Sequence, residues 1–248
     1  LGAQDKGESL TISEAQEIVN THHSLKSTLR LPRLTKLDAD VARVLSQVQG
    51  NLELPTIKEL ELAAAEGLAQ HRGALYLDGL TLMPIEVAEK LARKQGFLSL
   101  AGVTDLSPEV ARVLARHRGQ LLLNGLSELP SEIAEILADH QGDLQLNQLK
   151  SLTLESARAL ARMPFALSLN GITELDKATS HALAQHAERL TLDHITSLND
   201  PALTHKLATT PFQLNLSRVR SIDEGTANIL ADRRGSLVLG VSELKPSI

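Results

Sequence analysis

Histidine recurs before a polar residue and a glycine along this 248-residue chain. The segments His71-Arg72-Gly73 and His117-Arg118-Gly119 share the pattern, and His140-Gln141-Gly142 is a close variant. A basic cluster beside a glycine could bind phosphate, ligate a metal or transfer a proton. The spacing of the clusters, 23 residues or a multiple of it, points instead to the elements that carry them.

The same spacing runs through nearly the whole chain. A Leu-x-Leu pair recurs every 23 residues, except for one step of 24 between Leu190 and Leu214. The pairs start at Leu29, Leu52, Leu75, Leu98, Leu121, Leu144, Leu167, Leu190 and Leu214, and a truncated copy starts at Leu237. With the first Leu as position 1, each interval is one repeat, and the histidines of the clusters occupy position 20.

Each repeat combines the patterns of a strand and a helix. In the repeat LSLAGVTDLSPEVARVLARHRGQ, Leu98 and Leu100 flank Ser99, so the two leucines point inward and the serine outward, as in a half-buried strand. Val110, Ala111 and Leu114 recur at the spacing of one helix face. The pattern predicts a short strand, a bend and a helix of about ten residues.

The sequence also predicts where each helix begins and ends. Ser107-Pro108-Glu109 supplies a capping hydroxyl, a proline at the first helical position and an acidic first turn, and Pro130-Ser131-Glu132 and Asp200-Pro201 are variants. A glycine in the left-handed conformation is predicted to end the helix at position 22. These glycines are Gly50, Gly73, Gly96, Gly119, Gly142 and Gly235.

Strand, helix and parallel strand must be joined by a right-handed crossover. Nine repeats therefore predict an α/β solenoid, with short parallel strands on the concave face and helices on the convex face. We expect a tail and helical cap over residues 1–28, nine repeats over 29–236 and a truncated tenth over 237–248, all in one continuous domain.

The repeats resemble those of the leucine-rich repeat superfamily. LRLPRLTKL and LELPTIKEL, at residues 29–37 and 52–60, resemble the bacterial BspA-like class, and units reading LxLNGLxxL resemble the 23-residue repeats of planctomycetes. The chain departs from the common consensus because no Asn stands three residues after the second leucine of the Leu-x-Leu pair. The resemblance implies a right-handed leucine-rich-repeat-like solenoid.

Composition excludes several classes of function. A net charge of −5 argues against a nucleic-acid partner, and no apolar run approaches the roughly 18 residues of a membrane span. The absence of cysteine excludes disulfides and thiol chemistry.

Leu1-Gly2-Ala3 resembles the remnant of a cleaved export signal, which favours a periplasmic, envelope or extracellular location over the cytoplasm. A domain taken from a longer protein would explain this start equally well.

The polar residues show no pattern typical of catalysis. GxSxG, P-loop and HExxH motifs are all absent, and the Ser and Thr residues sit at positions that serve turns and helix caps. The position-20 histidines are expected on an exposed convex rim, beside helix C-terminal carbonyls and without carboxylate support for a metal. We therefore expect no catalytic residue, no metal and no cofactor.

The concave face is the expected binding surface, since positions 2, 4 and 5 should face solvent there. Tyr76, Arg30 and Arg33 are the expected anchors, because Tyr and Arg are frequent hot-spot residues. The full set of candidates is Arg30, Arg33, Glu53, Tyr76, Asp78, Leu122, Asn124, Asn147, His194 and Arg218. In the alternative interpretation, the Asn and Asp residues of this face only cap backbone groups.

The sequence thus predicts a non-enzymatic scaffold, monomeric or weakly self-associating, that binds another protein through its concave face. The alternative is a structural segment of a larger envelope or secreted protein that self-associates or stacks through an open C-terminal edge. A carbohydrate platform is disfavoured, because such sites use several aromatic side chains and this face carries one.

Overall fold

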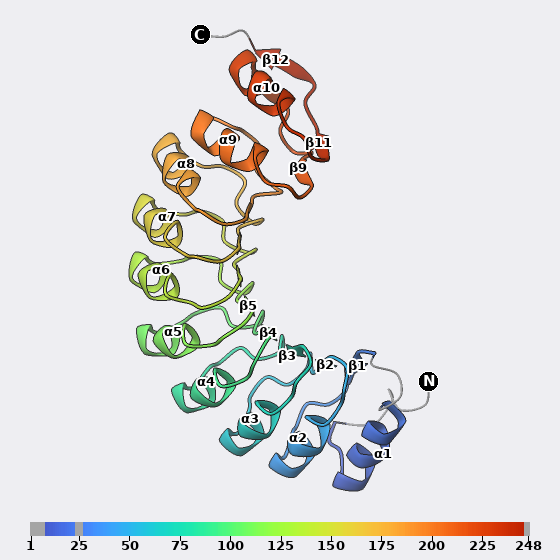
Figure 1. The fold of residues 1–248 in the computed structure, drawn as a ribbon. Coiled ribbons are helices and arrows are strands. Elements are labelled where there is room, and N and C mark those ends of the chain that lie inside the picture. Colours follow the sequence, from blue (N-terminus) through green and yellow to red (C-terminus); the bar gives the residue numbers. More distant parts are fainter. Residues whose placement is uncertain (1–7, 23–26, 246–248) are drawn as a thin grey trace. The chain divides into compact units, whose positions relative to one another are not determined.

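The computed structural model describes residues 8–22 and 27–245, so Leu1-Gly2-Ala3 lies outside the described residues. The chain forms two compact units. The first comprises Leu1–Gly125 and His140–Asp143, and the second comprises Leu126–Asp139 and Leu144–Ile248. Both are built from the predicted strand–helix repeat, with the strands of each unit on one side and its helices on the other (Figure 1).

In the first unit the strands are parallel and adjacent in chain order. They are β1 (Leu29–Arg30), β2 (Leu52–Glu53), β3 (Leu75–Tyr76), β4 (Leu98–Ser99) and β5 (Leu121–Leu122). The helices are α1 (Ile12–His22), α2 (Ala39–Leu45), α3 (Leu62–Leu68), α4 (Ile85–Leu91) and α5 (Pro108–Leu114). The register is one repeat per strand, as in the pairing of Leu29 with Leu52.

The second unit has the same alternation, with helices of seven or eight residues. Its elements are α6 (Ser131–Leu137), β6 (Leu144–Gln145), α7 (Leu154–Leu160), β7 (Leu167–Ser168), α8 (Lys177–Ala184), β8 (Leu190–Thr191), α9 (Pro201–Ala208), β9 (Leu214–Leu216), β10 (Ser221–Asp223), α10 (Glu224–Ala231), β11 (Leu237–Leu239) and β12 (Glu243–Lys245). Strands β6, β7 and β8 pair in parallel. Strand β9 pairs with β11, and β10 pairs with β12.

An aliphatic core fills the space between the strands and helices of each unit. In the nine complete repeats the leucines at positions 1 and 3 are buried, as Leu98 and Leu100 are, and so are Val110, Ala111 and Leu114 on the helix. These are the faces that the two periodicities predicted. The α/β repeat class expected from the sequence is therefore confirmed.

The helices are shorter than predicted. Helices α2–α7 contain seven residues each, because each begins only after the polar bend and ends at position 17. The cap at Ser107 is confirmed, since its hydroxyl accepts a hydrogen bond from the amide of Val110 at 3.3 Å. The variant at Pro130-Ser131-Glu132 differs, because Pro130 itself is the capping residue and no side chain caps the helix.

The predicted left-handed helix stop at position 22 is wrong. Helix α4 ends at Leu91, five residues before Gly96, and the residue that caps it has right-handed helical dihedrals. Of the described position-22 glycines, Gly96 and Gly119 have positive φ, 81° and 140°. At Gly119 glycine also permits a close approach of the chain to the preceding repeat. A Cβ on Gly119 would lie 2.2 Å from the carbonyl oxygen of Gly96.

The first described element of the first unit is helix α1, and no strand precedes it among the described residues. Helix α1 buries Ala15, Ile18 and Val19 and packs against α2. Ahead of it, the carbonyl oxygen of Glu8 accepts hydrogen bonds from the amides of residues 35 and 36 at 2.9 and 3.0 Å. Helix α1 therefore covers the side of α2 where no earlier repeat is present among the described residues.

Candidate functional site

The position-20 histidines do not form the exposed rim expected from the sequence. His71, His117, His140 and His186 are at most 2% exposed. The His117 Nε2 atom lies 2.8 Å from the carbonyl oxygen of Gly96, and the His140 Nε2 atom lies 2.9 Å from that of Gly119. These rings turn inward because the segment after each helix runs beside the preceding repeat and leaves backbone carbonyls there to be satisfied.

The geometry defines the protonation state of two of these rings. A carbonyl oxygen can only accept, so the Nε2 atoms of His117 and His140 carry the proton. Their Nδ1 atoms are buried and have no hydrogen-bond partner among the described residues. The two rings stack with centroids 6.0 Å apart. Burial lowers the pKa of His71, His117 and His140, so these imidazoles are neutral at pH 7.

Two cationic side chains share the same position. Lys94 is fully buried, its ammonium donates to the carbonyl of Gln95 at 2.7 Å, and burial lowers its pKa to about 8. In the second unit, Arg233 donates to the carbonyls of Ala208 and Thr210 at 2.8 Å. We call these side chains the position-20 column: His71, Lys94, His117 and His140 in the first unit, and His186 and Arg233 in the second. Each hydrogen bond that the structure describes for a side chain of this column joins it to a backbone carbonyl.

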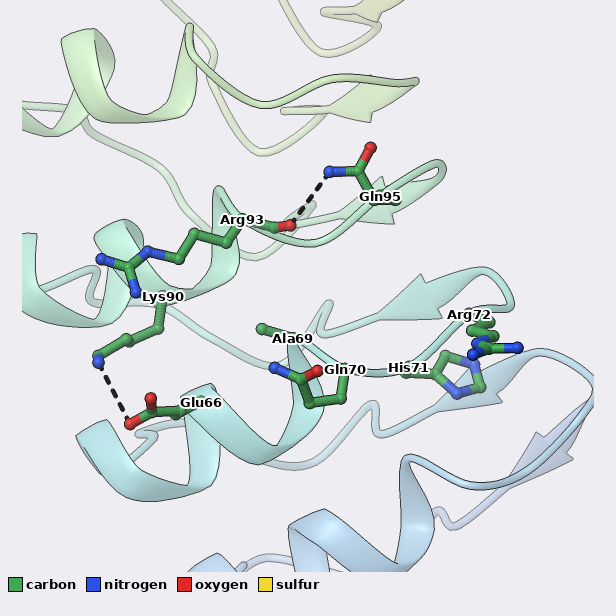
Figure 2. A pocket seen from close by; sticks show the side chains of 8 residues that line it. All are labelled: Glu66, Ala69, Gln70, His71, Arg72, Lys90, Arg93 and Gln95. Atoms are coloured by element: carbon green, nitrogen blue, oxygen red, sulfur yellow. Dashed lines mark hydrogen bonds and ion pairs between the residues drawn. The ribbon is translucent and has the colours of Figure 1, made fainter.

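A polar depression of about 320 Å³ opens beside this column, between the ends of α3 and α4 (Figure 2). Its one carboxylate, Glu66, is paired with Lys90 at 3.2 Å. The amide of Gln95 donates to the carbonyl of Arg93. The lining contains no hydroxyl or thiol that could act as a nucleophile. Across the described residues, no three His, Cys, Asp or Glu side chains lie close enough together to hold a metal.

The strand side of the first unit carries the expected row of position-2 side chains. Arg30 faces Glu53, which faces Tyr76, and Ser99 faces Leu122, each in register on adjacent strands. The Arg30 Nε and Glu53 Oε2 atoms are 3.6 Å apart. Leu122 is half-buried rather than exposed. We call this row, together with Phe97, the strand face: Arg30, Glu53, Tyr76, Phe97, Ser99 and Leu122.

Phe97 belongs to this surface although the sequence analysis did not select it. Its ring centroid lies 4.8 Å from that of Tyr76, with the planes tilted by 44°. Both side chains are half-buried. Phe97 stands at position 23, two residues before the position-2 residue of β4, so strand alternation directs both side chains to the same side. The period of two could therefore have identified it.

The position-4 side chain accepts hydrogen bonds from a hydroxyl and a backbone amide of the next repeat. The Asp78 carboxylate accepts from the Ser99 hydroxyl at 2.5 Å and from the amide of Ala101 at 3.2 Å. In the second unit, Asn147 Oδ1 accepts from the Ser168 hydroxyl at 2.7 Å and from the amide of Asn170 at 3.0 Å. Asp78 and Asn147 thus cap backbone groups, as the alternative interpretation proposed. Carboxylate and amide make equivalent contacts at this position.

The surroundings of Tyr76 are negatively charged. Burial raises the pKa of the Tyr76 phenol, and the charges of Glu53 and Asp78 raise it further. Asp78 is exposed, and its hydrogen-bond donors described above are neutral groups. The aromatic pair therefore lies in a negative local potential.

No protein-family model and no curated protein matches the chain. Solved structures do: an internalin from Listeria monocytogenes is 16% identical over 94% of this chain and 77% of its own, with a TM-score of 0.48. Internalin C2 from the same species is 15% identical over 96% and 84%, with a TM-score of 0.38. A leucine-rich repeat protein from Leptospira interrogans is 17% identical over 88% and 66%, with a TM-score of 0.42. At such identities the similarity concerns the fold alone.

The chain is a repeat protein in which short parallel strands alternate with helices. Within this repeat protein, the first unit brings Arg30, Glu53, Tyr76 and Leu122 into one row, with Asp78 at its edge. Arg33 is exposed and Asn124 half-buried in the same unit. The remaining candidates, Asn147, His194 and Arg218, belong to the second unit. In the described part of the repeat protein, no helix is both long and apolar enough to cross a membrane.

Proposed function

We propose that this repeat protein is a non-enzymatic scaffold that binds another protein through the strand face of its first unit. The observation that carries the proposal is the contact between Tyr76 and Phe97, with Leu122 on the same row. Half-exposed aromatic side chains on a rigid repeat supply contact area at low entropic cost. Arg30 and Glu53 supply a polar rim beside them.

A non-enzymatic role is supported by what occupies the candidate catalytic positions. The histidines that suggested proton transfer or metal binding are buried in the position-20 column and at most 2% exposed. The half-exposed His194 and the exposed Arg33 and Arg218 are proposed as secondary contacts in a larger interface. We also propose that the repeats belong to the bacterial 23-residue class and that the protein is exported.

Affinity capture from the source organism tests the binding face. We expect Tyr76→Ala and Leu122→Glu each to lower the yield of captured protein partner by about tenfold or more, as for a hot-spot residue. The matched control is Leu62→Glu on helix α3, where the side chain is 45% exposed. If both strand-face variants capture the same partners at the control's yield, the proposed surface is wrong.

A second candidate function is self-association through the edge strand β11. Among the described residues β11 pairs with β9, and its Val238 and Leu239 are 38% and 44% exposed. An exposed apolar edge strand is a template for pairing with another chain. We expect sedimentation velocity to show concentration-dependent dimers that Val238→Glu abolishes. A monomer at all concentrations would contradict this candidate.

A further inference from the structure

We infer that Tyr76, Phe97 and Asp78 form a receptor for one arginine side chain of the protein partner. The inference rests on the proposed function and specifies the chemistry that the strand face recognises. Three features carry it: two adjacent aromatic rings, an exposed carboxylate beside them, and an apolar neighbour on the same row.

The aromatic pair offers the first of these features. The ring centroids of Tyr76 and Phe97 are 4.8 Å apart and the planes are tilted by 44°, so the rings meet at an angle instead of covering each other face to face. Both side chains are half-buried, which leaves part of each ring accessible. The face of an aromatic ring is electron-rich and attracts a cation, and a planar guanidinium also stacks on it.

The carboxylates favour a cation and disfavour an anion at this place. Glu53 lies beside Tyr76 across the β2–β3 pairing, but Arg30 balances part of its charge at 3.6 Å. Asp78 is exposed, and it accepts hydrogen bonds from the Ser99 hydroxyl and the Ala101 amide. These neutral donors hold the carboxylate in place, and no described cationic side chain compensates its charge. Arginine can pair with such a group through two parallel N–H bonds.

The residue between Tyr76 and Leu122 accounts for the shape of the surface. Ser99 is the position-2 residue of β4, and it is only 1% exposed because larger neighbours cover it. Leu122 is half-buried on the next strand. An arginine stem is apolar, and it packs on aliphatic surface while the guanidinium reaches the charged group. In this arrangement Leu122 contacts the apolar stem of the arginine, and Asp78 pairs with its guanidinium.

The test is an NMR titration of the full chain with N-acetylarginine amide. Tyr76 is the only tyrosine of the chain, so its ring signals are assigned without ambiguity. We expect saturable shifts of these signals with a Kd of about 1–10 mM. N-acetylcitrulline amide has nearly the same shape without the charge, and we expect it to bind at least about fivefold more weakly.

Asp78→Asn isolates the contribution of the carboxylate charge. The substitution keeps the hydrogen bonds of position 4, because Asn147 makes the equivalent contacts in the second unit. We expect at least about fivefold weaker binding of the arginine probe. Asp105→Asn is the matched control, since Asp105 is exposed, away from the strand face, and the change in net charge is the same.

Two results would overturn the inference: equal binding of the arginine and citrulline probes, or equal effects of Asp78→Asn and Asp105→Asn. The capture experiment distinguishes this failure from a failure of the proposed function. Loss of partner in Tyr76→Ala without arginine selectivity would leave the strand face as the binding surface and exclude the arginine receptor. Unchanged capture would place partner binding elsewhere.

Discussion

Gly119→Ala lowers the free energy of unfolding by at least about 3 kcal/mol, the largest effect expected of a single methyl group in this chain. The new Cβ would lie 2.2 Å from the carbonyl oxygen of Gly96, and φ at this position is 140°. The backbone cannot move away without cost, because the carbonyls of Gly96 and Gly119 accept hydrogen bonds from His117 and His140. Urea denaturation followed by circular dichroism measures the change.

Two neighbouring glycines separate the contributions of strain and collision. At Gly96 φ is 81°, but a Cβ would meet nothing within 4 Å. Gly96→Ala therefore measures the cost of backbone strain alone, and we expect it to lower the free energy of unfolding by about 1 kcal/mol. At Gly142 a Cβ would lie 1.9 Å from the Gly119 carbonyl oxygen. Gly142→Ala therefore measures the cost of the steric clash between the new methyl group and that oxygen. Gly225→Ala in α10 is the control, since its nearest neighbour is 3.6 Å away. A Gly119→Ala protein as stable as Gly225→Ala would contradict the close packing of position 22.

Acidification below pH 6.5 is expected to destabilise the first unit through its buried histidines. Burial holds the pKa of His71, His117 and His140 below the value of 6.5 that they regain on unfolding. The unfolded chain therefore binds protons first, and the stability present above pH 6.5 is lost as the pH falls toward the folded pKa values. Each histidine contributes up to about 1.4 kcal/mol per pH unit in this window.

The position-20 column provides both controls for this prediction. The double variant His117→Gln, His140→Gln keeps a side-chain amide that can reach the same carbonyls, and we expect it to lose about two thirds of the pH dependence of the first unit between pH 6.5 and 5. Lys94 tests the pH dependence of stability in the alkaline range. Its folded pKa of about 8 lies below the unfolded value of 10.5, so stability should rise between pH 8 and 10.5, and Lys94→Met should remove that rise. If the free energy of unfolding depends on pH equally in the wild type and the double variant between pH 6.5 and 5, the assignment of this dependence to His117 and His140 is wrong.

The repeat architecture was predictable because it depends on periodicity alone. Strand alternation at Leu98 and Leu100 and the helix spacing of Val110 and Leu114 determine which side chains are buried, and both patterns are local. The cap at Ser107 was predictable for the same reason, since its hydrogen bond spans three residues. The row of position-2 side chains followed from the strand register, which the repeat length imposes.

The role of the histidine–glycine segments was not predictable from one repeat, because their partners lie in the preceding one. His117 bonds to Gly96 and His140 to Gly119, residues 21 positions apart in the chain. The same holds for Asp78 and Ala101, which lie in adjacent repeats. Tyr76 and Phe97 lie near opposite ends of one repeat, 21 residues apart, and meet only once the chain has folded back. The sequence by itself determined the period, the buried faces and the candidate row. Only the tertiary structure decided which polar side chains are buried and which aromatic groups meet, because both depend on how closely one repeat packs on the next.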